Sequence, residues 1–353
     1  MGKRHHYIPC MLLSRFGEGS GRDAKVWVFD KSTGDIRHQK VQNVAYEKFL
    51  YRVPASVVEK DAALGLPKHM LHVDGMEDVF QLQEDVANGI LDAMEAKARL
   101  PEDAEMEFLL WFVLMLESRN PEQLERIRQI DELTLNAHAR VAAHNDPTLF
   151  GGRAPDIAMP FDENRHILVG HALKLSEDLL PYMRARKWTL RVSTSMRGGL
   201  VCGDVPLNIS LTVPRRGFHH NPAHAVNRTM VSVPLSSSLL LTGEFEGKGG
   251  VAAADERWVG YANAVAFSRA ERFVYSRSRD FPIMLLPSLV PVRDAVNGIF
   301  PVIPFDAEGF SAKAKDGRFK RPRQLVNPDA LPQIDRILAG YAAMDSERHT
   351  RSD

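Results

Sequence analysis

The chain has 353 residues, and its 45 basic side chains balance its 45 acidic ones, so its formal net charge is zero. This balance excludes a general electrostatic attraction to nucleic acid or anionic membranes, although a local basic patch remains compatible with it. Apolar residues make up 44% of the chain, a proportion typical of globular proteins. Two cysteines, Cys10 and Cys202, are too few for a disulfide scaffold or a four-cysteine zinc site.

Sparse cysteine is also typical of a reducing compartment. No stretch of the sequence has the length and apolar character of a membrane span, and the apolar residues near the N-terminus are too interrupted for a signal peptide. We therefore expect a cytoplasmic protein that does not associate with membranes.

The first predicted elements are β-strands. Residues 26–29 (VWVF) are rich in strand-forming side chains, and residues 36–41 could form a second strand. The turn formers DKSTGD between them predict a β-hairpin whose loop contains Gly34.

A helical block follows. Apolar residues recur at helical spacing over residues 76–98, and residues 102–118 are apolar on almost every side, which predicts a buried helix. A third helix is expected over 120–143, with Asn120 as N-cap and Pro121 in the first turn. A fourth is expected over 163–186, which Pro181 either kinks or ends early.

Strand patterns return after this block. Residues 187–194 (KWTLRVST) predict a strand, and residues 199–204 (GLVCGD) predict its hairpin partner. Further expected elements are strands over 229–235, 238–244 and 272–276, a helix over 255–270 and a short helix over 334–343.

This segregation of strands and helices predicts an α+β fold. We expect a mixed or antiparallel sheet built from N- and C-terminal strands, with the large helical block inserted between them. The predicted parts are an N-terminal hairpin element (1–60), the helical block (76–186), a β-rich part that completes the same sheet (187–280) and a mixed tail (281–353), all within one large domain.

Several segments are similar to one known pattern. HHYIPCMLLSRF resembles the opening of the bacterial domain-of-unknown-function 4238 family, and VWVFDKSTGDI resembles its hairpin. ESRNPEQLERI, WTLRVS with VCGDVPL, VSVPLSSSLLL and ANAVAFSRAERFVYS resemble its later elements, to about residue 280. Gly203-Asp204-Val205-Pro206 stands where the family often has Ser-Asp-Asn-Pro. The resemblance implies no established activity, cofactor or substrate.

His5 and His6 are the first candidate catalytic residues. Histidine can act as a general acid, a general base or a metal ligand near neutral pH. Neighbouring side chains on a strand point to opposite faces, so the two are not expected to act together. We favour His6, because it keeps the place before tyrosine in the resembled pattern; the alternative is an ordinary histidine pair in a mobile terminus.

Asp204 is the third candidate catalytic residue. It lies at the end of an apolar strand, where a carboxylate often serves as a metal ligand or general base. The alternative is a turn aspartate that binds its own backbone.

Arg15, Arg119 and Asn263 are candidate substrate-binding residues. Arginine suits carboxylate and phosphate groups, but a structural salt bridge is the alternative for Arg15 and a helix-dipole role for Arg119. Asn263 lies within an alanine-rich helix and is alternatively a structural bridge. Glu84 is either a site carboxylate or a paired residue on a helix face.

Other polar segments are less specific. The spacing of His220 and His224 suits two metal ligands, but Pro222 between them argues against a helix, so a histidine-containing loop is favoured. His69 and His72 raise the same question. The basic run 313–323 could contact nucleic acid, or be solvated. The common zinc-protease, serine-hydrolase and nucleotide-binding motifs are absent from the sequence.

These residues lead to one main hypothesis. We expect a phosphodiester-cleaving enzyme, a nuclease-like effector of bacterial defence or conflict. His6 would be its base, Asp204 would bind a divalent ion or orient His6, and Arg15 and Arg119 would hold phosphate. The alternatives are a non-enzymatic protein-recognition module and a small-molecule hydrolase. The metal and the cofactor stay undetermined, with a divalent ion as one option.

Overall fold

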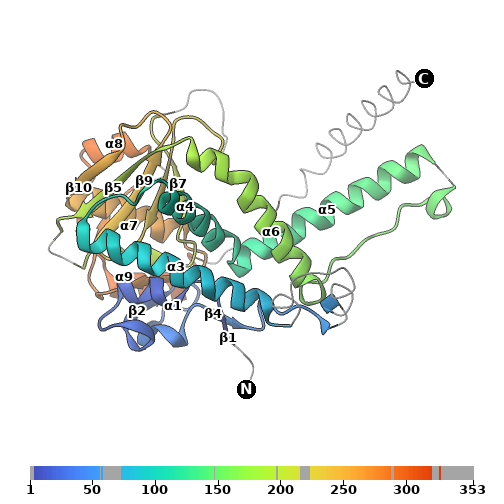
Figure 1. The fold of residues 1–353 in the computed structure, drawn as a ribbon, viewed down its shortest axis with the longest axis horizontal. Coiled ribbons are helices and arrows are strands. Elements are labelled where there is room, and N and C mark those ends of the chain that lie inside the picture. Colours follow the sequence, from blue (N-terminus) through green and yellow to red (C-terminus); the bar gives the residue numbers. More distant parts are fainter. Residues whose placement is uncertain are drawn as a thin grey trace. The chain divides into compact units, whose positions relative to one another are not determined.

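The computed structural model describes residues 4–55, 57–58, 73–146, 148–195, 198–214, 223–287, 290–319 and 326 (Figure 1). The chain forms two compact units. The larger comprises residues 1–121 and 172–321, and the smaller comprises residues 122–171 and 322–353. The predicted α+β class is confirmed, and each unit is described by itself below.

A four-stranded sheet of the larger unit combines two strands from the N-terminal part of the chain with two strands from its C-terminal part. Its strand order is β3 (Ile36–Lys40), β2 (Lys25–Asp30), β11 (Phe273–Ser276) and β6 (Cys202–Gly203), and all pairs are antiparallel. The predicted hairpin of β2 and β3 is therefore confirmed, as is the sharing of one sheet by N- and C-terminal strands.

A second sheet of the larger unit has five strands. Their order is β10 (Gly250–Ala254), β5 (Lys187–Ser193), β9 (Leu239–Glu244), β8 (Thr229–Pro234) and β7 (Asn208–Leu211). Only the β10–β5 pair is parallel among these strands. The predicted strands β8 and β9 are both present and pair with one another, whereas β10, whose sequence GVAAA has little strand propensity, was not predicted.

The predicted hairpin of β5 with residues 199–204 is wrong. Strand β5 pairs with β9 and β10, whereas β6 pairs with β11 in the other sheet. Gly198 and Gly199 between them have φ values of +50° and +74°, and a Cβ on either would meet a backbone oxygen, of Asp280 or Ser237, at less than 3 Å. The chain thus passes here through a crowded left-handed bend instead of a hairpin turn.

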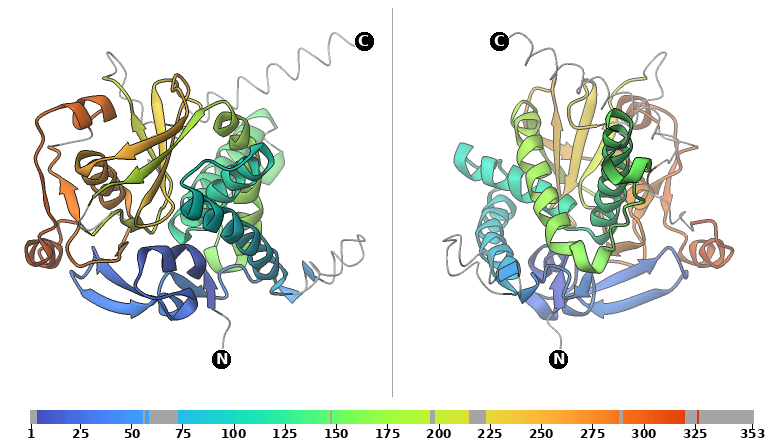
Figure 2. Two further views of the ribbon diagram at one scale, coloured as in Figure 1. Left: turned by 60° about the vertical axis from the view of Figure 1, so that its left-hand side comes forward. Right: turned by 90° about the vertical axis from the view of Figure 1, so that its right-hand side faces the viewer.

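The five-stranded sheet is covered on both faces (Figure 2). Helix α7 (Glu256–Arg269) lies on one face, where the Arg191 guanidinium lies 3.5 Å from the ring centroid of Trp258. On the opposite face, the Trp188 indole donates a hydrogen bond to the carbonyl oxygen of Met183, near the end of helix α6 (Phe161–Arg184). Apolar side chains on both sides of this sheet therefore form much of the core.

The helical block is also confirmed. It consists of α3 (Gly75–Lys97), α4 (Asp103–Ser118), α5 (Pro121–Asn145) and α6 (Phe161–Arg184). The α4 residues 109, 110 and 112–116 are all buried, as its uniformly apolar sequence predicts. Pro181 lies inside α6, so it does not end the helix before Arg184.

In the smaller unit, α5 holds the extended segment that precedes α6. Asn136 accepts a hydrogen bond from the backbone nitrogen of Ile157 and donates one to its carbonyl oxygen. Glu132 accepts from the backbone nitrogen of Met159 and pairs with Arg128. Between α5 and α6, the residues Leu149–Gly152 form a 3-10 turn.

Shorter elements complete the larger unit. Strand β1 (Arg4–His6) pairs with β4 (Tyr46–Lys48), and β12 (Pro282–Met284) pairs with β13 (Val302–Pro304). The short helices are α1 (Cys10–Leu13), α8 (Val292–Asn297) and α9 (Ala307–Lys315), and the 3-10 turns are Ser14–Phe16, Gly21–Asp23 and Val41–Asn43. The short helix predicted over 334–343 falls outside the described residues. Of the helices that are described, none combines the length and apolar character needed to cross a membrane.

Candidate functional site

The candidate site is built on the first strand, which antiparallel pairing with β4 holds in place. His5 lies opposite Glu47 and His6 opposite Tyr46 in this ladder. The two imidazoles have different partners, because the His5 ring stacks on Tyr51 at 5.6 Å and the His6 ring lies 5.7 Å from Tyr46. The alternation of side chains along a strand thus separates them.

His5 is part of the packing around the start of α3. Its side chain is fully buried, and Nδ1 accepts a hydrogen bond of 2.9 Å from the backbone nitrogen of Tyr51. Its Nε2 lies 3.7 Å from Oδ1 of Asp74, the residue before α3. The hydrogen bond to Tyr51 and the proximity to Asp74 connect β1 with the chain that leads into α3.

His6 is also buried, but it keeps an unused nitrogen. Its exposed fraction is 7%, and Nε2 has no hydrogen-bond partner among the described residues. Burial, followed by the positive charge of Arg22, lowers the pKa of His6 to about 4, and Arg119 and Arg4 act in the same direction. The imidazole is therefore neutral at pH 7, with a free polar atom beside three guanidinium groups.

Arg119 connects the helical block to the first strand. Its Nη2 donates to the carbonyl oxygen of His6 and lies 2.8 Å from Oε1 of Glu84, and the guanidinium covers the ring of Phe80 at 4.3 Å. Burial by itself lowers the pKa of Arg119, but the charge of Glu84 and the Tyr51 hydroxyl offset this, so that its pKa is raised. Arg119 is a buried, paired cation, and Glu84 is the paired residue that was one of its two predicted alternatives.

The next residue, Asn120, reaches the Gly-Asp-Val-Pro turn. Its Nδ2 donates a hydrogen bond of 2.6 Å to the carbonyl oxygen of Asp204. One dipeptide at the end of α4 therefore binds the backbone of both the first strand and a turn distant in sequence. Through Arg119 and Asn120, the N-terminal histidine strand and the Asp204 turn are both attached to the end of α4.

The Asp204 carboxylate is used within the protein. Oδ1 accepts from the backbone nitrogen of Glu271, and Oδ2 accepts from those of Arg272 and Phe273, at 2.7 to 2.8 Å. Burial raises the pKa of Asp204 to about 6, although these donors act in the opposite direction. Asp204 thus fixes the start of β11, which explains its position without a substrate.

Tyr7, which the sequence analysis did not single out, faces this carboxylate. Burial, followed by the charge of Asp204, raises the pKa of Tyr7. The signal that could have found it is its place directly after His6, where the first strand ends.

Arg15 binds side chains in the C-terminal half of α3. It donates to Oδ1 of Asp92 and Oε2 of Glu95, each at 2.6 Å, and to Oδ1 of Asn88 at 2.8 Å. These bonds correspond to the structural salt bridge that was its alternative interpretation.

Asn263 is a buried bridge inside the core. Its Oδ1 accepts from the backbone nitrogen of Val201, and its Nδ2 donates to the carbonyl oxygens of Gly199 and Pro282. Both halves of the amide are satisfied by backbone groups of two separate segments, 199–201 and Pro282, so that Asn263 ties α7 to its neighbours.

The other histidines considered as metal ligands form no metal centre among the residues that the structure describes. His224 Nε2 lies 3.1 Å from Oε2 of Glu117, whereas His219, His220, His69 and His72 fall outside the described residues. Within the described ranges, no group of three or more histidine, cysteine, aspartate or glutamate residues is arranged to hold a metal ion. Of the basic run, the structure describes residues 313–319, which include the end of α9.

Fold and site together define a class: an α+β protein in which a buried arginine attaches an N-terminal histidine strand to a helical block. The chain belongs to the DUF4238 family, described as a protein of unknown function, whose model matches residues 4–280. The matched region contains all six of the predicted site residues. No curated protein and no solved structure matches the chain.

Proposed function

We propose that this protein cleaves a phosphodiester, as a nuclease-like enzyme, and that His6 is its general base. The observation that carries the proposal is the buried Nε2 of His6, which lacks a hydrogen-bond partner among the described residues. A nitrogen that is desolvated and unpaired is costly to the fold, and such groups are typical of functional sites. A water molecule or a substrate hydroxyl would satisfy it, and a general base acts on such a group.

Two arginines beside this ring are suited to hold the phosphate. Arg22 is exposed and forms no ion pair with another described residue. Arg4 donates to the carbonyl oxygen of Gln42 and to Oδ1 of Asn43, neither of which carries a charge. Arg15 and Arg119 are neutralised by carboxylates, so we assign phosphate binding to Arg4 and Arg22 and the positioning of β1 to Arg119.

The charge balance explains how the base would be activated. Without substrate, burial and the nearby guanidinium groups keep the pKa of His6 low, at about 4. A phosphate group between the arginines and the imidazole would offset their positive charge and raise this pKa toward neutrality, where a general base is most effective. Binding of the substrate phosphate would thereby convert His6 into an effective general base.

The test is hydrolysis of bis(p-nitrophenyl) phosphate and of single-stranded RNA and DNA, with Mg²⁺, with Mn²⁺ and with EDTA. We expect His6→Asn to reduce kcat at least about a hundredfold, the usual contribution of a general base. The matched control is His38→Asn, because His38 is exposed on β3 and stacks on Trp27. Arg22→Met should raise KM, with the exposed Arg37→Met as its control. Equal activity of the wild type and His6→Asn would refute the role of His6.

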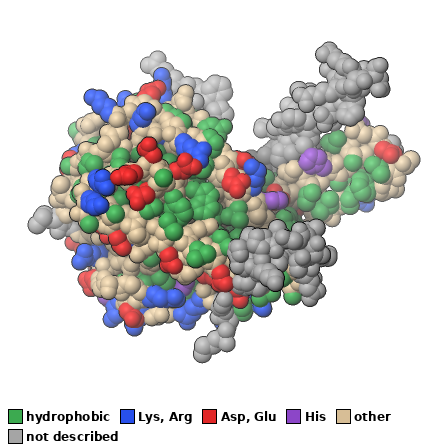
Figure 3. All heavy atoms as spheres, viewed as in Figure 1, with side chains coloured by type: hydrophobic (Ala, Val, Ile, Leu, Met, Phe, Trp, Pro, Cys, Tyr) green, Lys and Arg blue, Asp and Glu red, His purple; other side chains and the backbone are tan. Residues whose placement is uncertain are grey.

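A second candidate, a protein-recognition module, is favoured by the exposed apolar residues of α3. Leu82 and Val86 lie one helical turn apart, and 66% and 52% of their surfaces are exposed. On the face of the larger unit in Figure 3, acidic and basic side chains are interspersed, which suits a protein partner as well as a nucleic acid. If the recognition module is correct, Leu82→Glu with Val86→Glu abolishes capture of a partner, and His6→Asn leaves it unchanged.

A further inference from the structure

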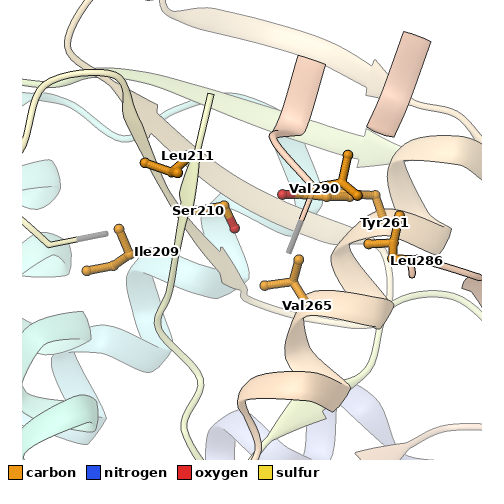
Figure 4. A pocket seen from close by; sticks show the side chains of 7 residues that line it. All are labelled: Ile209, Ser210, Leu211, Tyr261, Val265, Leu286 and Val290. Atoms are coloured by element: carbon orange, nitrogen blue, oxygen red, sulfur yellow. The ribbon is translucent and has the colours of Figure 1, made fainter. Parts of the chain in front are cut away.

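A hollow lies between the edge strand β7, helix α7 and the segment that follows β12 (Figure 4). Its cavity volume is about 40 Å³, which is room for one small polar group. Its lining residues are Ile209, Ser210, Leu211, Tyr261, Val265, Leu286 and Val290. Ser210 points from β7 toward α7, and Ile209 and Leu211 point to the other side of the strand.

The chemistry of this lining is specific. Of the side chains that face it, those of Val265, Leu286 and Val290 are aliphatic, and those of Ser210 and Tyr261 carry hydroxyl groups. The oxygens of Ser210 and Tyr261 point toward each other, and the Tyr261 hydroxyl bonds to Ser210. Both residues are buried, and no charged side chain is among the lining residues. The site therefore offers one neutral hydrogen-bonding position at the end of an apolar surface.

A second hollow adjoins the first. Val265 and Leu286 line both hollows. The second is completed by Ala264, Ser268, Ile283, Met284 and Leu285, and its cavity volume is about 400 Å³. Leu285 is 49% exposed, so this outer hollow reaches the surface. Because the two hollows share Val265 and Leu286, they lie next to each other along α7, and we call the apolar surface that they form together the path.

We propose that this path binds an uncharged aliphatic molecule with one hydrogen-bonding head group, of the class of medium-chain alcohols. The head group would bond to Ser210 and Tyr261, and the alkyl chain would lie against Val265 and Leu286. A charged head group is disfavoured, because burying it here without a counter-ion costs far more than burying a hydroxyl. The proposal is independent of the His6 site, with which it shares no residue.

The experiment uses the full chain and the uncharged fluorophore N-phenyl-1-naphthylamine, whose emission rises in apolar surroundings. We expect the protein to enhance this emission and 1-octanol to displace the probe, with octanoate at pH 8 at least about tenfold weaker. Ser210→Ala should weaken 1-octanol about fivefold, the contribution of one neutral hydrogen bond.

Leu286→Trp tests the location of the path, because it adds volume at the wall that both hollows share. It should reduce probe binding at least about tenfold. Ile299→Trp is the matched control, since Ile299 is 97% exposed and lines neither hollow. Circular dichroism verifies that each variant is folded. No enhancement by the wild type, equal displacement by octanoate and octanol, or unchanged binding by folded Leu286→Trp would each overturn the proposal.

Discussion

The Arg119 guanidinium donates a hydrogen bond of 2.8 Å to the carbonyl oxygen of His6, 113 residues earlier in the chain. The same guanidinium pairs with Glu84, and both side chains are largely buried, at 3% and 12% exposure. This buried ion pair holds the strand on which the proposed catalytic histidine lies. The position of His6 therefore depends on α3 and α4 as much as on its own strand.

The first prediction concerns this pair. Arg119→Met should lower the free energy of unfolding by about 3–5 kcal/mol, because it leaves the Glu84 carboxylate buried without its partner. The double variant Arg119→Met, Glu84→Met should be less destabilised than the single one, since no charge is then buried. Urea unfolding measures both, and a double variant less stable than Arg119→Met would contradict this account.

The second prediction concerns Arg15, whose carboxylate partners are more exposed. Asp92 and Glu95 are 62% and 37% exposed, so solvent and salt screen their attraction to Arg15. Arg15→Met should cost only about 1–2 kcal/mol, from two exposed ion pairs and a hydrogen bond to Asn88. The loss should shrink in 1 M NaCl, whereas that of Arg119→Met should not. A loss equal to that of Arg119→Met at both salt concentrations would show that Arg15 is not screened.

The third prediction concerns Asp204. Its two oxygens accept hydrogen bonds from three backbone nitrogens. Asparagine presents an NH₂ group in place of one oxygen, so Asp204→Asn would set a donor against a donor at the start of β11. We expect a loss of about 2–3 kcal/mol at pH 7 in thermal or urea unfolding. Asp280→Asn, on the neighbouring surface loop, serves as a control that should change stability little.

The fourth prediction concerns pH. The folded state lowers the pKa of His6 from 6.5 to about 4, so only the unfolded chain takes up this proton between these values, and His6 reduces stability as the pH falls through this range. The folded state raises the pKa of Asp204 from 3.8 to about 6, so Asp204 increases stability as the pH falls from 6 to 3.8. Over the same range, the two residues therefore oppose each other, each by about 3 kcal/mol.

Unfolding between pH 4 and 7 separates the two effects. Relative to the wild type, His6→Asn should gain stability as the pH falls, and Asp204→Asn should lose it. Parallel pH profiles of the wild type and His6→Asn would mean that His6 is protonated equally in both states.

The periodic segments of the sequence were sufficient to predict the helical block and the β2–β3 hairpin. The helical spacing of α3, the uniformly apolar α4 and the DKSTGD turn are local signals, and local hydrogen bonds decide such elements. The sequence also placed β8, β9, α7 and β11, each of which has an apolar run or a helical period of its own.

The sequence did not correctly predict which strand pairs with β5. Residues 199–204 have the strand pattern expected of a partner for β5. However, strands pair through backbone groups that are the same in every residue, so this pattern does not identify the antiparallel neighbour. The crowded bend at Gly198 and Gly199 directs these residues to β11 instead. Short strands such as β1 and β10 gain their stability from a neighbour distant in sequence, so their own residues hardly indicate them.

The candidate site shows the same division. The sequence alone indicated the residue types, His6, Arg119 and Asp204, and that they would meet near the first strand. Only the tertiary structure decided their partners: Glu84 neutralises Arg119, three backbone nitrogens occupy Asp204, and the His6 Nε2 is left without a partner among the described residues. The physical reason is that a charge or hydrogen bond is satisfied by whichever groups the folded chain brings within about 3 Å, and distance along the sequence does not determine that set.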